Sequence, residues 1–156
     1  MMFSFRSIRA ATTVMALATL ASCSKKDDAT PTPAADAQGM SWTVDGSNAT
    51  TTTAAAQVTS GNIVTLFGAT GNTGGVILDV PKTAGTYTIT STSDASATYL
   101  VTPSTGASQS YDATTGTLVV SAVSATNISG TFTFTGAASS GTATKALTNG
   151  KFNVKL

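Results

Sequence analysis

The stretch GTFTFTG, residues 130–136, shows the fold of this chain most directly. In it Phe132 and Phe134 alternate with three threonines, and a glycine stands at each end. Strict alternation of apolar and polar residues is typical of a β-strand with one buried and one solvated face. Threonine is β-branched, so it suits a strand while its hydroxyl faces water. We therefore predict a strand here, with both phenylalanines in a core.

Short strand-like runs separated by turn residues continue through most of residues 40–156. Besides the stretch above, they are MSWTVDG, NIVTLFG, VILDV, GTYTIT, ATYLV, TLVVSAV and the terminal ALTNGKFNVKL. Roughly nine or ten strands, about ten residues apart and without a helical period, predict an all-β domain. We expect a mainly antiparallel sheet that forms a barrel or a sandwich.

Three turn signals divide these runs. Asp45-Gly46 predicts a turn directly after the strand that contains Trp42 and Val44. The segment 108–116, SQSYDATTG, predicts a short strand followed by a turn. Asn149-Gly150, between two strand-like runs, is the strongest hairpin signal in the chain because Asn-Gly favours a type I′ turn.

The composition excludes several kinds of site. The chain has 156 residues, which suggests one domain once any processed segment is removed. Its net charge of +1, without a basic stripe, gives no reason to expect a nucleic-acid partner. His and Glu are absent, and the single Cys can form neither an internal disulfide nor a Cys/His zinc site. We therefore expect no metal and no cofactor.

The N-terminus has the organisation of a signal peptide. Residues 1–9 carry Arg6 and Arg9 without any acid, and residues 10–21 are uncharged and moderately apolar. A basic segment followed by a short apolar one is typical of secretory signals. The apolar run is shorter than the about 20 residues that a spanning helix needs.

Four residues close this segment: Leu20, Ala21, Ser22 and Cys23. They resemble the lipobox of bacterial lipoproteins, which has a branched apolar residue, two small residues and then Cys. The resemblance implies that signal peptidase II cuts before Cys23, that a glyceride is attached to its thiol and that its new amino group is acylated. Two or three acyl chains on one residue would hold the protein on a membrane. An alternative is ordinary secretion with a cut after Ala18, which would leave Cys23 unpaired.

The residues after Cys23 read as a tether. Lys25, Lys26, Asp27 and Asp28 resemble the surface-export signal of Bacteroidota lipoproteins; the alternative is a solvated charge run that keeps the tether off the membrane. Ser24, and not Asp, follows the Cys, so the usual inner-membrane retention signal is absent. The segment 29–39 contains two prolines and no large apolar residue, a composition that does not fold alone. We thus divide the chain into a signal peptide (1–22), a lipidated tether (23–39) and a β domain (40–156).

Candidate catalytic residues in the β domain are limited to four aspartates, because general acid–base chemistry usually uses His, Glu or paired Asp. They are Asp45, Asp79, Asp94 and Asp112. We expect structural roles for all four: Asp79 lies on the strand face opposite Leu78, and the other three lie in or beside turn-like stretches. Calcium binding is the alternative, although no D-x-D-x-D-G loop is present.

Other motifs give weaker signals. GATGNTGG, residues 68–75, lacks the Lys of a phosphate-binding P-loop and predicts a hairpin loop. No G-x-S-x-G nucleophile elbow occurs. Large aromatics could stack on sugar rings, but we expect Trp42 to lie in the core. The aromatic candidates are Trp42, Tyr87, Tyr99 and Tyr111.

The β domain also carries a family resemblance. GTYTIT, ATYLV, YDATTGTLVVSAV, NISGTFTFTG and LTNGKFNV together resemble the recurring pattern of small Bacteroidota lipoproteins whose β domain has no assigned function. The resemblance implies an outer-membrane or surface location and supplies no catalytic residue.

We expect a lipid-anchored cell-envelope protein with a non-enzymatic binding or structural module, whose partner is an unidentified protein or glycan. The alternative is a barrel-type carrier of a small apolar ligand or a glycan-binding module. A filled interior favours the module, and an open apolar lumen favours the carrier.

Overall fold

The computed structural model describes residues 37–71 and 73–156, which form ten β-strands and no helix. The strands are β1 (Gly39–Val44), β2 (Ser47–Thr51), β3 (Ala55–Ser60), β4 (Ile63–Ala69), β5 (Gly74–Pro81), β6 (Gly85–Ile89), β7 (Ser96–Val101), β8 (Gln109–Val123), β9 (Asn127–Ala138) and β10 (Thr144–Lys155). All their pairings are antiparallel. The all-β prediction is therefore confirmed.

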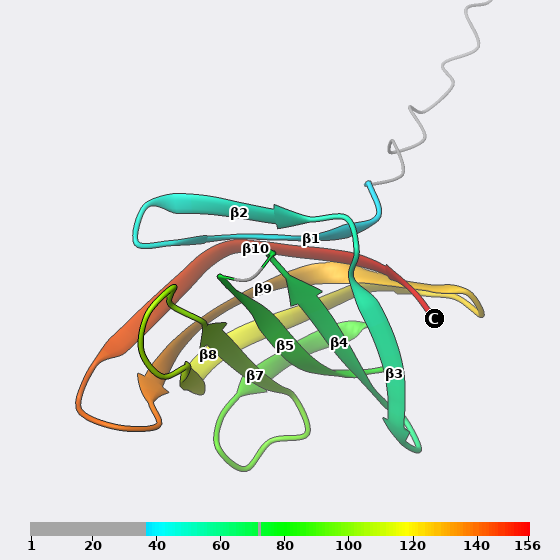
Figure 1. The fold of residues 1–156 in the computed structure, drawn as a ribbon. Coiled ribbons are helices and arrows are strands. Elements are labelled where there is room, and N and C mark those ends of the chain that lie inside the picture. The colour runs from blue at the N-terminus through cyan, green and yellow to red at the C-terminus, as the bar shows by residue number, and fades with distance from the viewer. Residues whose placement is uncertain (1–36, 72) are drawn as a thin grey trace, which may run out of the picture. The chain divides into compact units, whose positions relative to one another are not determined.

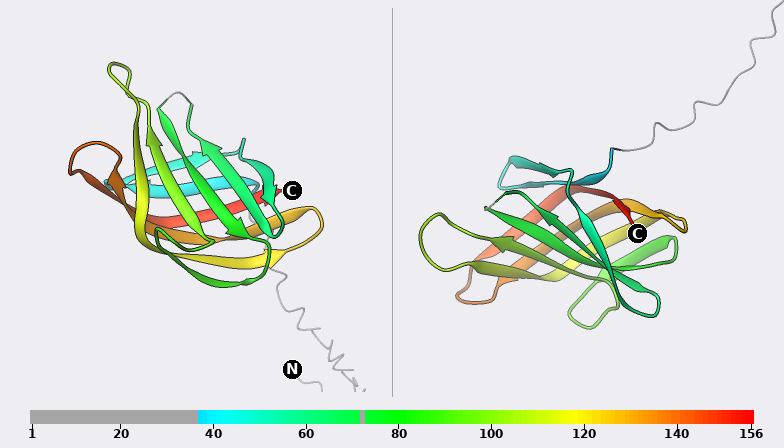
Figure 2. Two further views of the ribbon diagram at one scale, coloured as in Figure 1. Left: turned by 90° about the horizontal axis from the view of Figure 1, so that it is seen from below. Right: turned by 45° about the vertical axis from the view of Figure 1, so that its right-hand side comes forward.

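The ten strands belong to one sheet: nine follow the order β2-β1-β10-β9-β8-β7-β5-β4-β3, and β6 pairs with β8 beside this path. Strand β8 is long enough to pair with β7 near its start and with β6 further along. The sheet curls, so that β4, β5 and β7 lie in front of β8, β9 and β10 in Figure 1. Two further views show the same half-barrel (Figure 2). The architecture is thus one curled sheet, closer to a barrel than to two stacked sheets.

The core lies inside the curl. Trp42 and Phe132 are among its largest buried side chains, and Phe134 is buried beside Phe132 with ring centroids 6.2 Å apart. Across the inside of the curl, β1 and β4 pack against each other: a Cβ on Gly68 would lie 2.8 Å from the Sδ of Met40. Apolar side chains from nearly all strands occupy the interior.

Strand β10 runs through the site of the predicted Asn149-Gly150 hairpin, so that prediction is wrong. Asn149 has a φ of 53°, and the pairing of β10 with β9 shifts register between Leu147 and Gly150. This is a β-bulge, which uses the same left-handed backbone conformation that a tight turn needs. An Asn-Gly pair therefore marks either feature, and only the neighbouring strand decides between them.

The turn predicted within residues 108–116 is also absent. Strand β8 continues through it, with a bulge between Ala113 and Thr115, and Asp112 lies in the strand. Gly116 stands there because β9 approaches closely: a Cβ on it would lie 2.4 Å from the carbonyl oxygen of Thr133. A glycine in a strand can mark such an approach as well as a turn.

Two predicted turns are confirmed. Asp45 (φ 50°) and Gly46 (φ 75°) connect β1 to β2, as a type I′ turn requires. At the glycine-rich segment, Ala69 of β4 pairs with Gly75 of β5, and the amide of Thr70 donates to the carbonyl of Gly74 at 2.9 Å, so these two strands form the predicted hairpin.

The start of β1 is tied to the end of β10. Gly39 pairs with Asn153, and the side-chain amide of Gln38 donates to Asn127 Oδ1 at 3.0 Å and to Asn153 Oδ1 at 3.4 Å. The chain therefore enters the sheet beside its last strand.

Candidate functional site

The outward face of β4, β5 and β7 carries apolar side chains that the core does not use. Phe67 in β4 pairs with Ile77 in β5, and both point away from the interior. Leu100 in β7 lies across from Gly75 on the same face. Phe67 is 39% exposed, whereas its neighbour Leu66 is fully buried. This part of the sheet is thus apolar on both faces.

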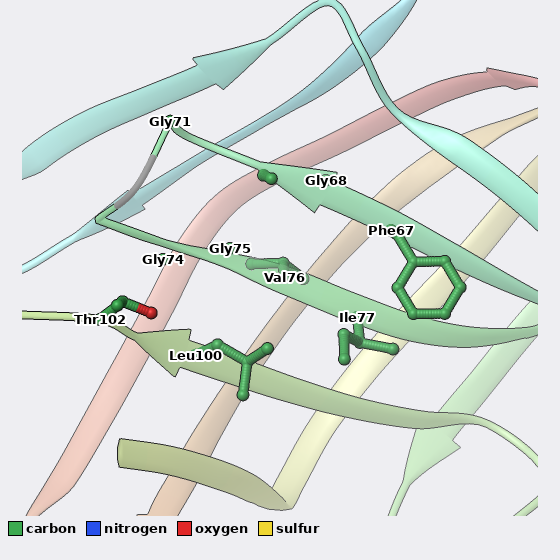
Figure 3. A pocket seen from close by; sticks show the side chains of 10 residues that line it. Phe67, Gly68, Gly71, Gly74, Gly75, Val76, Ile77, Leu100 and Thr102 are labelled. Atoms are coloured by element: carbon green, nitrogen blue, oxygen red, sulfur yellow. The ribbon is translucent and has the colours of Figure 1, made fainter. Parts of the chain in front are cut away.

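These side chains border an open groove with a volume of about 450 Å³. Figure 3 shows Phe67 and Ile77 along one side, Leu100 and Thr102 toward the other, and bare glycine backbone between them. Among the described residues, no charged side chain lines the groove. The lining residues are Phe67, Gly68, Ala69, Gly71, Gly74, Gly75, Val76, Ile77, Leu100 and Thr102.

The bare floor follows from close packing of two strands. A Cβ on Gly75 would lie 2.4 Å from the carbonyl oxygen of Gly68, so β4 and β5 can pair here only with glycine. Its partner on the outward side is the small Ala69. On the outward face of β4 and β5, the bulky pair Phe67 and Ile77 is therefore followed by the pair Ala69 and Gly75, which has almost no side chain. This difference in side-chain size forms the groove.

Asp79 lies on the same outward face, two residues from Ile77. Its Oδ1 accepts from Thr65 Oγ1 at 2.6 Å, and its Oδ2 accepts from Ser96 Oγ at 2.7 Å. The prediction that Asp79 lies opposite the buried Leu78 is confirmed. The two hydroxyls hold the carboxylate in one orientation at the edge of the apolar surface.

Asp112 lies on this face as well, in β8. Its Oδ1 accepts from Thr98 Oγ1 at 3.0 Å, and Thr98 pairs with Ile77. In the described part of the chain the ion pair joins Lys145 to Asp45, and neither Asp79 nor Asp112 has a cationic partner. Asp79 and Asp112 each have their own hydroxyl partners and do not form a carboxylate pair.

The ion pair between Asp45, in the β1–β2 turn, and Lys145 lies near Tyr99. Burial raises the pKa of Tyr99, while nearby Lys145 lowers it less strongly. The hydrogen bond with Asp45 raises the pKa of Lys145. Tyr99 packs on Tyr111 with ring centroids 6.1 Å apart. Tyr111 is thus buried, and Tyr99 is partly buried and packs against it.

The remaining candidates have structural positions. Trp42 is buried in the core, as predicted, and its Nε1 has no hydrogen-bond partner within the described residues. Tyr87 donates its hydroxyl to the carbonyl of Thr83 at 2.8 Å. Asp94 is exposed in the loop between β6 and β7, as its turn-like context indicated.

Two kinds of feature are absent from residues 37–71 and 73–156. No cluster of three His, Cys, Asp or Glu side chains there could hold a metal ion. None of these residues forms a helix with the length and hydropathy needed to cross a lipid bilayer.

The predicted processing and export residues lie outside the described residues, and they stay predictions. They are Leu20, Ala21, Ser22, Cys23, Lys25, Lys26, Asp27 and Asp28. The groove, in contrast, was missed at the sequence level. The sequence feature that could have indicated it is the presence of apolar residues on both faces of NIVTLFG and VILDV. Glycine ends the first of these runs, and two glycines precede the second.

Comparison with known proteins identifies a family without a known activity. A family model described as a domain of unknown function, DUF6252, matches residues 36–154. No curated protein and no solved structure matches the chain. Because the family match covers well over half of the 156 residues, the chain belongs to the DUF6252 family.

Proposed function

We propose that this protein is a lipid-anchored, non-enzymatic binding module of the cell envelope, and that the groove on β4, β5 and β7 is its binding surface. The observation that carries the proposal is the open apolar groove of about 450 Å³ on the outside of a sheet that already has a complete core. Exposed apolar surface that folding does not require is typical of interaction sites.

The interior supports a module over a barrel-type carrier. Large side chains such as Trp42, Phe132 and Leu118 occupy the inside of the curl and are almost fully buried. A ligand placed there would have to displace them, whereas the groove on the outer face is open without any rearrangement.

The described aspartates support a non-enzymatic role. Asp45 is paired with Lys145, and Asp79 and Asp112 are each held by hydroxyl groups. Acid–base chemistry usually needs two groups that share one substrate position, and these carboxylates do not meet.

The anchor half of the proposal rests on the lipobox-like Leu20 to Cys23 and is tested in cells. Wild-type protein should incorporate labelled fatty acid and fractionate with the outer membrane, and Cys23→Ser should lose both properties. Continued labelling of the variant would contradict the anchor.

A surface-export role for Lys25, Lys26, Asp27 and Asp28 is tested by replacing all four with Ala. This change should reduce protease cleavage of the protein on whole cells, and unchanged cleavage would contradict the export role.

The groove half is tested with N-phenyl-1-naphthylamine, a neutral dye that fluoresces in apolar sites. The purified mature chain, residues 23–156 with Cys23→Ser, should enhance its fluorescence, and Phe67→Ser should abolish most of that enhancement. Val123→Ser is the matched control, because Val123 is 36% exposed and lies away from the groove. Equal loss in both variants would contradict a specific site.

A further inference from the structure

The groove has a charged border that its apolar lining does not reveal. Asp79 follows Ile77 by two positions on β5, and Asp112 lies beyond Thr98 in the row of paired residues that contains Ile77. One carboxylate is therefore displaced from the groove along the strand direction, and the other is displaced across the strands. Both lie on the outward face with the exposed Phe67.

These carboxylates are held in place but not neutralised. Asp79 accepts from two hydroxyls, and Asp112 accepts from one, Thr98. A hydroxyl donor orients a carboxylate without adding a positive charge beside it. Within the described residues the ion pair joins Lys145 to Asp45, and neither Lys145 nor Lys82, Lys151 or Lys155 forms an ion pair with Asp79 or Asp112. The surface therefore combines an apolar groove with two carboxylates that have no ion-pair partner.

We propose that the groove binds an extended peptide segment of another protein that carries a large aliphatic side chain and, two residues later, a lysine or arginine. This inference rests on the proposed function of the groove and names the chemistry of its partner.

Strand geometry gives the spacing. Side chains at i and i+2 of an extended chain point the same way and lie about 6.7 Å apart. The groove floor at Gly75 lies two residues before Ile77 on β5, and Asp79 lies two residues after it. A peptide aligned with β5 can therefore place its aliphatic side chain over Gly75, beside Ile77 and Phe67. The residue two positions later then lies over Ile77, from where the long side chain of a lysine or arginine can extend to Asp79. The cation can also reach toward Asp112, which adds long-range attraction.

The charge argues against a lipid surface as the occupant. Bacterial membranes are rich in anionic lipids, and an apolar patch that inserts into them is usually flanked by Lys or Arg. Here the flanking groups on the outward face are Asp79 and Asp112. A basic peptide complements this surface, and an anionic bilayer does not.

The test uses the mature chain, residues 23–156 with Cys23→Ser, labelled at its Ile and Leu methyl groups for NMR. The probes are the blocked pentapeptides Ac-TLTKT-NH2, Ac-TLTET-NH2 and Ac-TSTKT-NH2. The first should shift the Ile77 and Leu100 methyl signals and bind about three- to tenfold more tightly than the second, as expected for one or two surface ion pairs. The third should not shift these methyls, because it lacks the apolar anchor.

The charge preference should disappear in the variant Asp79→Asn/Asp112→Asn and at about 1 M salt, where screening is strong. Asp45→Asn is the control, since it removes one negative charge at the β1–β2 turn, and it should keep the preference. Equal affinity for the Lys and Glu peptides, or binding to phosphatidylglycerol vesicles that requires Phe67, would overturn this inference. If neither leucine peptide shifts the groove methyls, the groove itself is not a binding site and the proposed function fails too.

Discussion

Gly150 in β10 lies directly against Phe132 in β9. A Cβ on Gly150 would be 2.4 Å from the carbonyl oxygen of Phe132 and 2.6 Å from its ring. The two residues are register partners, and Phe132 is almost completely buried. The glycine thus allows the bulged strand to pack on one of the largest core side chains.

Substitution Gly150→Ala should therefore destabilise the protein by about 1–3 kcal/mol, the usual cost of overpacking a core. The free energy of unfolding can be measured with denaturant, using fluorescence of the single, buried Trp42. Gly85→Ala is the control, because a Cβ there meets only ordinary contacts at 3.4 Å and beyond. Equal effects of the two substitutions would contradict the close approach.

Asn149 gives a prediction about the bulge itself. Its φ of 53° is acceptable for Asn and Gly and costly for a β-branched residue. Asn149→Gly should leave the stability nearly unchanged, whereas Asn149→Val should cost about 1–2 kcal/mol or more. If Val is tolerated as well as Gly in denaturant unfolding, residue 149 does not have a left-handed backbone.

These two residues also show what sequence alone can predict. Alternation in segments such as TFTFT placed Phe132 and Phe134 in the core, because that pattern depends only on neighbours along the chain. Asn149-Gly150 and the glycine at position 116 gave wrong turns, because a glycine or an αL residue serves a bulge as well as a turn. The pairing strand decides, and it is distant in sequence.

The groove could not be predicted from the sequence for a similar reason. Its walls come from Phe67, Ile77 and Leu100 on three different strands, and its floor depends on Gly75 standing beside Ala69. Each strand alone shows only an apolar residue on its outer face. The register of β5 against β4 and β7 brings those residues together, and the register is a property of the whole sheet.

Asp79 should contribute to stability as well as to binding. Asp79→Ala removes the acceptor of the Thr65 and Ser96 hydroxyls, at an expected cost of about 1–3 kcal/mol. Asp79→Asn keeps an acceptor oxygen and should retain most of that stability. Denaturant unfolding of both variants checks this, and an Asn variant as unstable as the Ala variant would contradict it.

Stability should decrease in alkaline solution. The pKa values of Tyr99 and Lys145 are raised in the folded state, above 10.0 and 10.5 respectively. A raised pKa means that the folded state holds the proton of that group more tightly than the unfolded state does. The group's contribution to the free energy of unfolding is therefore complete below its unfolded pKa and is lost as pH rises through its folded pKa. Unfolding free energies should thus fall between about pH 9 and about pH 12.

Two variants separate the contributions to this alkaline loss. Tyr99→Phe removes the phenol that burial keeps protonated, and Lys145→Met removes the exposed ion pair with Asp45. In each variant the free energy of unfolding should fall less steeply with rising pH than in the wild type. The difference should be small for Lys145→Met because exposed ion pairs contribute little to stability. A decline that is unchanged in both variants would assign it to other groups.

In the proposed function, this domain binds its ligand on its outer face and not in its interior. Methyl NMR of the mature chain, residues 23–156 with Cys23→Ser, titrated with N-phenyl-1-naphthylamine, tests this most directly. We predict shifts of the Ile77 and Leu100 methyl signals, with the inward-facing Leu78, Ile89 and Leu118 unchanged. Shifts of those three interior methyls, with Ile77 and Leu100 unaffected, would contradict binding on the outer face and indicate a carrier with an internal ligand site.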